Sequence, residues 1–245
     1  MARAALPGRL TWRAADVVAA GVETPRARRI TLRVPDWAGH LPGQHVTVRL
    51  TAPDGYSAQR SYSLASPPER PDLDLVVERL DDGEVSPFLV DELRPGDAVE
   101  LRGPIGRYFV WRDGMGGPVQ LVAGGSGVVP FLAVLAHHRA VGSPVPVRLL
   151  VSARTAADVI GRRELDEAGP AVTVTLTRGA PPGWTGETGR VDAAMLARVA
   201  LPPSDAPTVL VCGPNGFVTA ASEALLALGH APERIKTERF GPSGG

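Results

Sequence analysis

Strongly apolar, strand-like runs alternate with helix-like runs throughout the second half of the chain. This alternation constrains the fold more than any other feature. The run VQLVAGG precedes VPFLAVLAHHRAVG, VRLLVSA precedes AADVIGRRELDEA, and TVLVCGP precedes GFVTAASEALLALG. Apolar strands joined by helical crossovers are typical of a parallel sheet that is buried on both faces. We therefore predict a parallel α/β domain over residues 118–245.

The first half of the chain has a different pattern. Between Leu10 and Trp111, about six short alternating or apolar runs are separated by Gly, Pro and Asp, as in Pro42-Gly43 and Asp54-Gly55. Short strands with frequent turn signals favour an antiparallel barrel or sandwich. The Gly-rich stretch at 114–118 marks the expected boundary, so residues 1–113 form the first predicted domain.

One short helix is expected within this β-rich half, near Ser86 to Leu93. Ser86 is a good N-cap residue, and Pro87 is well suited to the first helical position. The unpaired amide groups of a helix N-terminus attract anions. We therefore expect this end of the helix to be a candidate anion-binding site.

Composition excludes several classes of function. The chain has 26 basic and 26 acidic residues, so no sequence-wide field favours nucleic acid or an anionic membrane. Its one cysteine, Cys212, cannot supply the four thiolates of an iron–sulfur cluster, and the five histidines lack zinc-like spacing, so we predict no metal site. No run approaches the roughly 20 apolar residues of a membrane span, and the N-terminus lacks a signal-peptide-like stretch. A cytoplasmic location is the expectation.

The segment GGSGVVP lies between an apolar strand and an apolar helix. Gly124, Gly125 and Gly127 let the backbone approach a phosphate, which then faces the N-terminus of the helix. Pro130 stands where a G-x-G-x-x-G loop has its last small residue, and proline is tolerated in a first helical turn. The alternative is an ordinary Gly-rich connection between a strand and a helix.

The segment RSYS alternates along a predicted strand. Arg60 and Tyr62 point to one face, and Ser61 and Ser63 point to the other. An arginine can pair with a pyrophosphate, a tyrosine ring can pack on a flat heterocycle, and a hydroxyl can hydrogen-bond a ring nitrogen. The alternative is an ordinary barrel strand with an exposed arginine.

The segment VLVCGP places Cys212 at the carboxyl end of a parallel strand, just before Gly213 and Pro214. Ligands bind at this edge in open α/β sheets. The alternative is a cysteine that serves only as a small buried apolar residue. We expect no covalent role for the thiol.

With these motifs in this order, the chain resembles the ferredoxin–NADP⁺ reductase superfamily. More narrowly, it is similar to the flavin reductase halves of bacterial oxygenase reductases. The resemblance extends from PGQ at 42–44, through GPIGRYF at 103–109, to the C-terminal ERFGPSGG. It implies a six-stranded antiparallel flavin barrel over 1–113, followed by a Rossmann-like, parallel-sheet NAD(P)-binding domain over 118–245.

The resemblance also implies roles for the motif residues. Arg60 would bind the flavin pyrophosphate, Tyr62 would lie along the isoalloxazine and ribityl, and Ser63 would lie near the reactive N5. Ser63 and Cys212 are the expected catalytic residues, Cys212 as a polarizable group near the transferred hydride. The other implied cofactor contacts are Gly83, Val85 and Ser86 at the flavin phosphates, Gly124, Gly125, Gly127 and Pro130 at the nucleotide phosphates, and Gly213 and Pro214 beside the nicotinamide.

The end of the second strand of the α/β domain bears on the choice of nucleotide. An NAD-selective site often places a carboxylate there, whereas this chain has Ser152 and Arg154, with Arg163 on the next helix. Arginines suit a 2′-phosphate, and the NADP-using members of the family likewise show Ser and Arg, so NADPH is favoured over NADH. The alternative is that these arginines form solvated salt bridges with acidic residues such as Glu164 or Glu167.

The C-terminus departs from the plant-type pattern, which ends in a tyrosine that stacks on the flavin. Phe240 would cover the ring here, followed by a Gly-Pro-Ser-Gly-Gly tail that could be disordered. The alternative is that Phe240 is a core aromatic residue.

The resemblance implies hydride transfer from NADPH to bound FAD, with FAD favoured over FMN. Because the chain cannot hold its own cluster, electrons would leave to a separate acceptor such as a ferredoxin or a haem protein. Two other functions stay open: a redox-silent binding or regulatory module, and a flavin-free nicotinamide dehydrogenase.

Overall fold

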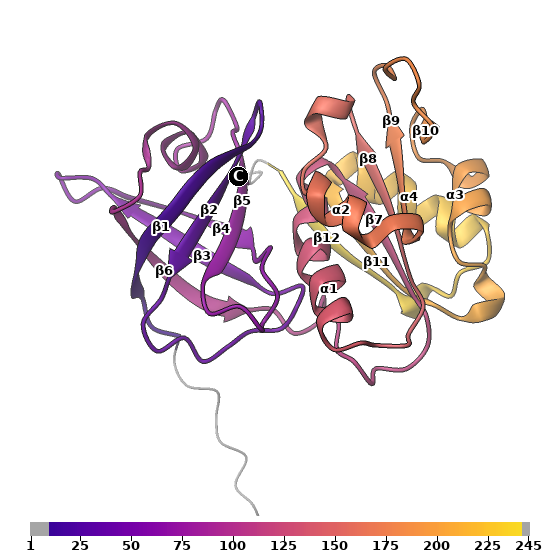
Figure 1. Ribbon diagram of the computed structural model, residues 1–245, viewed down its shortest axis with the longest axis horizontal. Coiled ribbons are helices and arrows are strands. Elements are labelled where there is room, and N and C mark those ends of the chain that lie inside the picture. The colour runs from indigo at the N-terminus through magenta and orange to yellow at the C-terminus, as the bar shows by residue number, and fades with distance from the viewer. Residues whose placement is uncertain (1–9, 242–245) are drawn as a thin grey trace, which may run out of the picture.

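The computed structural model describes residues 10–241. The expectations for the N-terminal segment 1–9 and for the tail after Gly241 lie outside the described residues. Figure 1 shows a β-rich half beside a half built from a sheet with helices. None of the helices within 10–241 combines the length and the apolar character that crossing a membrane requires.

The β-rich half is a six-stranded antiparallel sheet with the strand order β4-β3-β6-β1-β2-β5. An isolated bridge between Leu64 and Leu75 joins the two ends of this order, so the sheet curls into the predicted barrel. Alternating apolar residues, such as Val46 and Val48 of β3, fill its interior. The strands are β1 (Arg13–Thr24), β2 (Ala27–Arg33), β3 (His45–Thr51), β4 (Ser57–Ser63), β5 (Leu73–Glu78) and β6 (Ala98–Ile105).

The helix expected near Ser86 to Leu93 is present, but its N-terminus is not built as predicted. The helical turns run from Ser86 to Glu92 and end in the π-helix η1 (Phe88–Glu92), in which the Leu93 amide donates to the Phe88 carbonyl. The Ser86 hydroxyl accepts a hydrogen bond from the Leu80 amide at 3.1 Å and caps no helical amide. The N-cap prediction was therefore wrong, because this hydroxyl closes the preceding turn instead.

The second half is a six-stranded sheet with the order β10-β9-β8-β7-β11-β12, and all of its strand pairs are parallel. Apolar residues of α1 and α2 pack in one buried cluster and those of α3 and α4 in another, so helices cover both faces. The strands are β7 (Val119–Gly124), β8 (Val147–Ala153), β9 (Val172–Leu176), β10 (Glu187–Thr188), β11 (Thr208–Pro214) and β12 (Ile235–Phe240), and the helices are α1 (Val129–Ala140), α2 (Arg162–Ala168), α3 (Ala193–Val199) and α4 (Asn215–Ala227).

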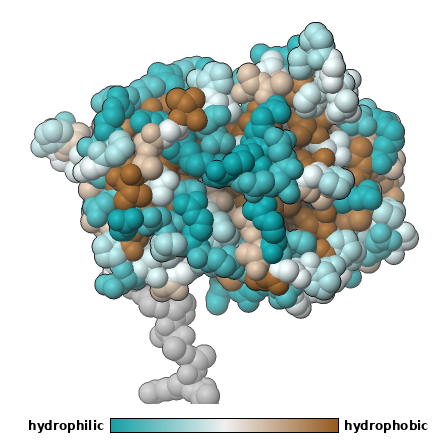
Figure 2. All heavy atoms as spheres, viewed as in Figure 1, coloured by the Kyte–Doolittle hydropathy of each residue, from teal (hydrophilic) through white to brown (hydrophobic). Residues whose placement is uncertain are grey.

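Apolar and charged contacts join the two halves. Phe109 and Trp111, which follow β6, belong to the buried cluster of the α/β half, and the rings of Phe109 and Phe131 are 5.8 Å apart. Glu69 of the barrel pairs with His137 of α1. A band of hydrophilic residues follows the junction on the face drawn in Figure 2. The junction thus combines a buried apolar contact with polar contacts at the surface.

Candidate cofactor-binding cleft

The RSYS strand lies at one end of the barrel sheet, and its register defines which side chains share a face. Arg60 is opposite Val48, and Tyr62 is opposite Val46, so both belong to the face that the core valines occupy. Tyr62 packs against the barrel core, and burial raises the pKa of its hydroxyl. Arg60 is exposed. The strand therefore presents an aromatic ring and, two residues away, an exposed cation.

Ser63 ends this strand with a polar atom that lacks a partner. Its side chain is buried, and its Oγ makes no hydrogen bond within the described part of the chain. A buried hydroxyl without a partner is costly, so it indicates a bond to a group that the protein itself does not supply. A heterocyclic nitrogen or carbonyl of a flavin fits this requirement.

The segment 83–86 lies beside the turn that leads into β4. The Tyr56 hydroxyl donates to Glu84 at 2.8 Å. The Glu84 carboxylate raises the pKa of Tyr56, and the Arg60 guanidinium partly offsets that shift. A Cβ on Gly83 would lie 2.9 Å from the Ser86 hydroxyl, which leaves no room for a side chain there. Val85 is fully buried within the barrel core, so its side chain is not available to a phosphate.

The glycine loop of the α/β half connects β7 to α1 through a short 3₁₀ turn, η2 (Gly125–Val128). Gly125 has a φ of +55°, which favours glycine. A Cβ on Gly127 would lie 2.2 Å from the Cys212 carbonyl oxygen, so the loop and the end of β11 touch backbone to backbone. Pro130 lies in the first turn of α1, where it is tolerated.

Cys212 is fully buried behind this contact. Burial, with a contribution from the nearby Glu238 carboxylate, raises the pKa of the thiol well above its usual range. The thiol is therefore protonated near neutral pH and is a poor nucleophile.

Glu238 is a titratable residue that the sequence reasoning missed. It lies on β12, where the register pairs it with Cys212, and burial raises its pKa to about 7. Phe240, two residues later, pairs with Pro214 at the end of β11 and packs against the buried cluster of the α/β half. The upper end of β12 reaches the junction of the two halves (Figure 1). The register between β11 and β12 is what places the Glu238 carboxyl group next to the Cys212 thiol.

A cleft of about 200 Å³ lies at the carboxyl edge of the parallel sheet. The predicted residues on its wall are Gly124, Gly125, Ser152, Arg154 and Pro214. The barrel contributes a second wall, and α4 contributes Phe217, none of which the sequence reasoning found. The additional lining residues are Thr24, Arg26, Glu78, Ser126, Ala153, Asp158, Ile160, Thr177 and Phe217.

Five predicted nucleotide contacts do not line this cleft directly: Gly127, Pro130, Arg163, Cys212 and Gly213. Gly213, with a φ of +152°, packs against Gly124 and Phe217, one layer behind the lining. Arg163 is on α2, 3.7 Å from Glu164 and 3.9 Å from Glu167. The structure thus gives Arg163 the salt-bridged arrangement that was the alternative interpretation.

The chain just after the RSYS strand joins a buried cluster that extends into the α/β half. Ala65, two residues after Ser63, belongs to this cluster, which also contains Val128 of the glycine loop and Cys212 of β11. Ser63 therefore lies close in the chain to the apolar contact between the two halves.

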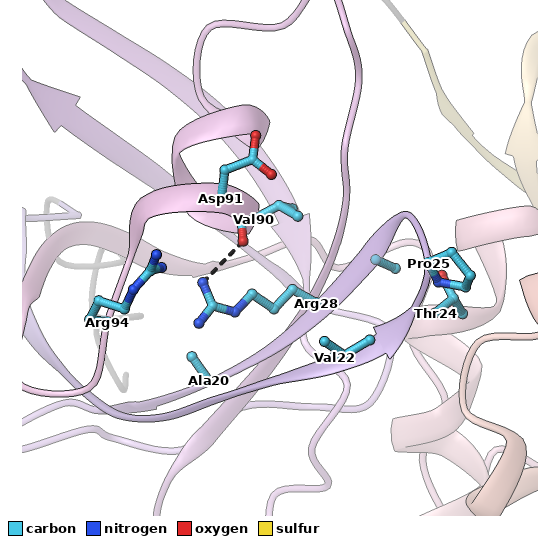
Figure 3. Close-up of a pocket in the computed structure, with 9 residues that line it drawn as sticks. Ala20, Val22, Thr24, Pro25, Arg28, Val90, Asp91 and Arg94 are labelled. Carbon is cyan, nitrogen blue, oxygen red and sulfur yellow. Dashed lines mark hydrogen bonds between the residues drawn. The ribbon is translucent and has the colours of Figure 1, made fainter.

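A second hollow, of about 310 Å³, lies on the barrel between the β1–β2 turn and η1 (Figure 3). It is lined by none of the predicted site residues. Arg28 points into it but donates to the carbonyl oxygens of Val90 and Leu93, as Figure 3 shows for Val90. This arginine therefore satisfies carbonyl groups at the end of η1.

Comparison with known proteins agrees with this geometry. The model of the oxidoreductase FAD-binding domain matches residues 17–110, and that of the oxidoreductase NAD-binding domain matches residues 121–223. The chain is 33% identical to NADH-cytochrome b5 reductase 1 of Pyricularia oryzae, over 84% of this chain and 70% of that protein. It is 32% identical to ferredoxin–NADP reductase B of Sorangium cellulosum, over 92% and 96%. The chain belongs to the ferredoxin–NADP⁺ reductase superfamily and is an oxidoreductase with FAD-binding and NAD(P)-binding domains.

Other relatives are longer than this chain. The glycine betaine monooxygenase reductase subunit of Chromohalobacter salexigens is 31% identical over 82% of this chain, which spans 56% of that protein. Among solved structures, the FAD/NAD-binding domain of nitric oxide dioxygenase from Vibrio cholerae superposes with a TM-score of 0.83 at 26% identity, covering 94% and 99% of the two chains. An Amycolatopsis cytochrome P450 reductase superposes with a TM-score of 0.81 at 27% identity, covering 96% and 71%.

The raised pKa of Glu238 predicts a pH dependence of stability. The folded chain holds this proton up to about pH 7, whereas an ordinary glutamate releases it near 4.5. As pH rises through this window the folded state binds more protons than the unfolded state, so the free energy of unfolding falls. We expect Glu238→Gln to reduce that decline by on the order of 1 kcal/mol, or about 2–4 °C in Tm.

Denaturant unfolding of both proteins between pH 4.5 and 8 tests this expectation. Glu233→Gln is the matched control, because Glu233 is exposed just before β12. Identical pH profiles for wild type and Glu238→Gln would mean that Glu238 titrates normally.

Proposed function

We propose that the protein passes a hydride from NADPH to bound FAD and then transfers electrons singly to a separate acceptor protein. The observation that carries this proposal is the buried hydroxyl of Ser63, which has no hydrogen-bond partner among the described residues. It is supported by Ala65, two residues later, which belongs to the buried cluster that also contains Cys212 at the carboxyl edge of the parallel sheet. We further propose that residues 1–113 form the flavin domain and residues 118–245 the nucleotide domain.

The side chains of the barrel suit the parts of FAD in sequence along β4. The exposed Arg60 guanidinium would neutralise the pyrophosphate, the Tyr62 ring would pack on the isoalloxazine, and Ser63 would donate a hydrogen bond to its polar edge. The backbone of Gly83 and Val85 would approach the phosphates. When bound, FAD supplies the ability to accept a hydride and release electrons one at a time.

The residues of the α/β half would bind and orient the nucleotide. The glycine loop, with Pro130 in the first turn of α1, would receive the pyrophosphate, and Gly213 and Pro214 would lie beside the nicotinamide. Cys212, protonated and buried, would provide a polarizable apolar surface, and Phe240 would cover the flavin from the end of β12. Glu238 would hold a proton near neutral pH next to this thiol.

Two arginines support the proposal that NADPH is the preferred donor. Arg154 lines the cleft from the sheet edge, and Arg26 lines it from the barrel. Arg26 pairs with Asp81 through an exposed ion pair, which is weak in water. The Asp158 carboxylate accepts from the Thr155 amide and hydroxyl, which engages it within its own turn. A 2′-phosphate would meet Arg154 on one wall and Arg26 on the other, with the Glu78 carboxylate also on the barrel wall.

The acceptor is proposed to be a separate ferredoxin or haem protein. Among residues 10–241, no group of three or more His, Cys, Asp or Glu side chains is arranged to hold a metal ion. The relatives include a cytochrome b5 reductase and a reductase subunit of a monooxygenase, so the superfamily serves acceptors of more than one kind.

An absorbance spectrum tests the central proposal. Purified protein reconstituted with FAD should be yellow, and anaerobic NADPH should bleach it within seconds. A ferredoxin or haem protein added afterwards should be reduced as the flavin colour returns. Protein that binds FAD but whose flavin colour neither NADPH nor NADH can bleach would be the redox-silent module. Protein that takes up no flavin would contradict the proposal altogether.

Arg60→Ala should weaken FAD binding without unfolding the barrel, because the exposed side chain contributes little to the core. Loss of a charge-assisted contact worth about 1.5–3 kcal/mol corresponds to a Kd raised roughly ten- to hundred-fold. Fluorescence titration of the flavin-free protein with FAD measures this Kd. Gln59→Ala is the matched control on the same strand. Among the described residues, Arg60 donates to the backbone carbonyl of Gln59, which this substitution leaves in place. Equal FAD affinity in the two variants would remove Arg60 from the site.

Arg154→Ala should raise the KM for NADPH roughly ten- to hundred-fold while changing that for NADH by less than about two-fold, since only NADPH carries the 2′-phosphate. Steady-state kinetics with NADPH and with NADH measure the two KM values. Arg148→Ala is the matched control, because Arg148 is exposed at the opposite end of β8 and donates to the Val199 carbonyl. A similar rise for both nucleotides would contradict the proposed specificity.

A further inference from the structure

Arg29 of β2 faces carboxylates from both halves of the molecule. Its Nε is 2.9 Å from Glu23, and its Nη1 is 3.5 Å from Asp74, both on the barrel. Its Nη2 is 2.8 Å from Glu164 on α2. One planar guanidinium thus bridges three acidic groups, one of which belongs to the α/β half.

A backbone hydrogen bond reinforces this bridge. The Gly161 amide, at the N-terminus of α2, donates to the Glu23 carboxylate at 2.7 Å. Gly161 has a φ of +73°, and a Cβ there would lie 2.4 Å from Leu132 of α1. Because Gly161 is packed this tightly against α1, its bond to Glu23 ties the barrel to a rigid part of the α/β half.

The cluster is sheltered and balanced in charge. The side chains of Arg29 and Asp74 are 20% and 3% exposed, and Glu23 and Glu164 are 13% and 15% exposed. Burial alone would lower the pKa of Arg29, but the surrounding carboxylates raise it, so the side chain stays charged. Arg70 pairs with Asp74, and Arg163 lies near Glu164, which completes three positive and three negative groups.

The cluster lies beside the nucleotide cleft. Thr24 and Ile160 line opposite walls of that cleft, and they are the chain neighbours of Glu23 and Gly161. The bond from Gly161 to Glu23 therefore spans the gap between the barrel wall and the sheet wall.

We propose that Arg29 is a positioning residue that, through Glu23 and Glu164, holds the two domains at the separation that hydride transfer needs. This inference rests on the proposed function. Arginine is required because its fork can engage Glu23 and Glu164 at once, whereas a lysine ammonium is a single point charge. A displacement of about 1 Å between reacting groups can slow a reaction by about a hundred-fold.

Loss of Arg29 should open the cleft without separating the domains. The apolar contact between Phe109 and Phe131 does not involve the cluster and would still hold the halves together. Removing the cation leaves Glu23, Asp74 and Glu164 sheltered beside one another, and this repulsion pushes the α2 end of the junction apart. FAD binding should persist, because the proposed flavin contacts of the barrel lie on β4 and in the segment 83–86, away from β2.

The test compares FAD-loaded Arg29→Ala, Arg29→Lys and Glu164→Gln with wild type. Amide hydrogen exchange at Gly161 reports directly on the bond to Glu23, and we expect it to accelerate at least about ten-fold in Arg29→Ala. Anaerobic stopped-flow reduction by saturating NADPH should slow about ten- to hundred-fold, while the Kd for FAD changes by less than about two-fold. Arg29→Lys should recover only part of either effect. The two milder variants keep the test decisive if Arg29→Ala does not fold.

Arg33→Ala is the matched control, because Arg33 lies on the same strand and pairs only within the barrel, with Asp72. The inference would be overturned if the Gly161 amide exchanged at the wild-type rate in Arg29→Ala. It would also be overturned if Arg33→Ala slowed flavin reduction by NADPH as much as Arg29→Ala does. A protein that takes up no flavin would instead refute the proposed function. Gly161 exchange in that flavin-free protein would still show whether Arg29 holds the domains.

Discussion

At the carboxyl edge of the parallel sheet, two segments of backbone meet with no room for a side chain between them. Gly127 of the glycine loop packs against the Cys212 carbonyl, and Gly124 and Gly213 pack against the ring of Phe217. Any larger residue at Gly127 would push the loop away from β11. The close approach keeps this edge compact, buries the Cys212 thiol, and leaves backbone amides available to a dinucleotide at the mouth of the cleft.

The two halves contribute different chemical groups to the proposed site. The barrel presents a cation, an aromatic ring and a buried hydroxyl without a partner along β4. The sheet presents a glycine-rich edge, a protonated thiol and a carboxyl group that titrates near neutral pH. Neither half alone contains both sets of groups, so their relative placement matters as much as their chemistry. The sheltered Arg29 cluster joins the barrel to α2 beside the nucleotide cleft, where we propose that it maintains this placement.

Sequence reasoning succeeded where a property depends on near neighbours in the chain. The alternation of Arg60, Tyr62 and Ser63 follows from the two-residue period of a strand, and β/α alternation predicts a parallel sheet. It failed at Ser86, because a hydroxyl after a turn can bond backward to Leu80 as easily as forward to a helix. It did not decide between the two interpretations of Arg163, which lies near Glu164 and Glu167 on α2.

The sequence by itself determined the family, the two kinds of sheet and most of the residues of the proposed site, because motifs are local and strand and helix periods are short. Only the tertiary structure revealed Glu238 beside Cys212, Phe217 against Gly124, Arg26 across from Arg154, and Arg29 between Glu23 and Glu164. Each of these arrangements brings together residues that are far apart in the chain. Strand register and domain packing create them, and no pattern within a single segment encodes either.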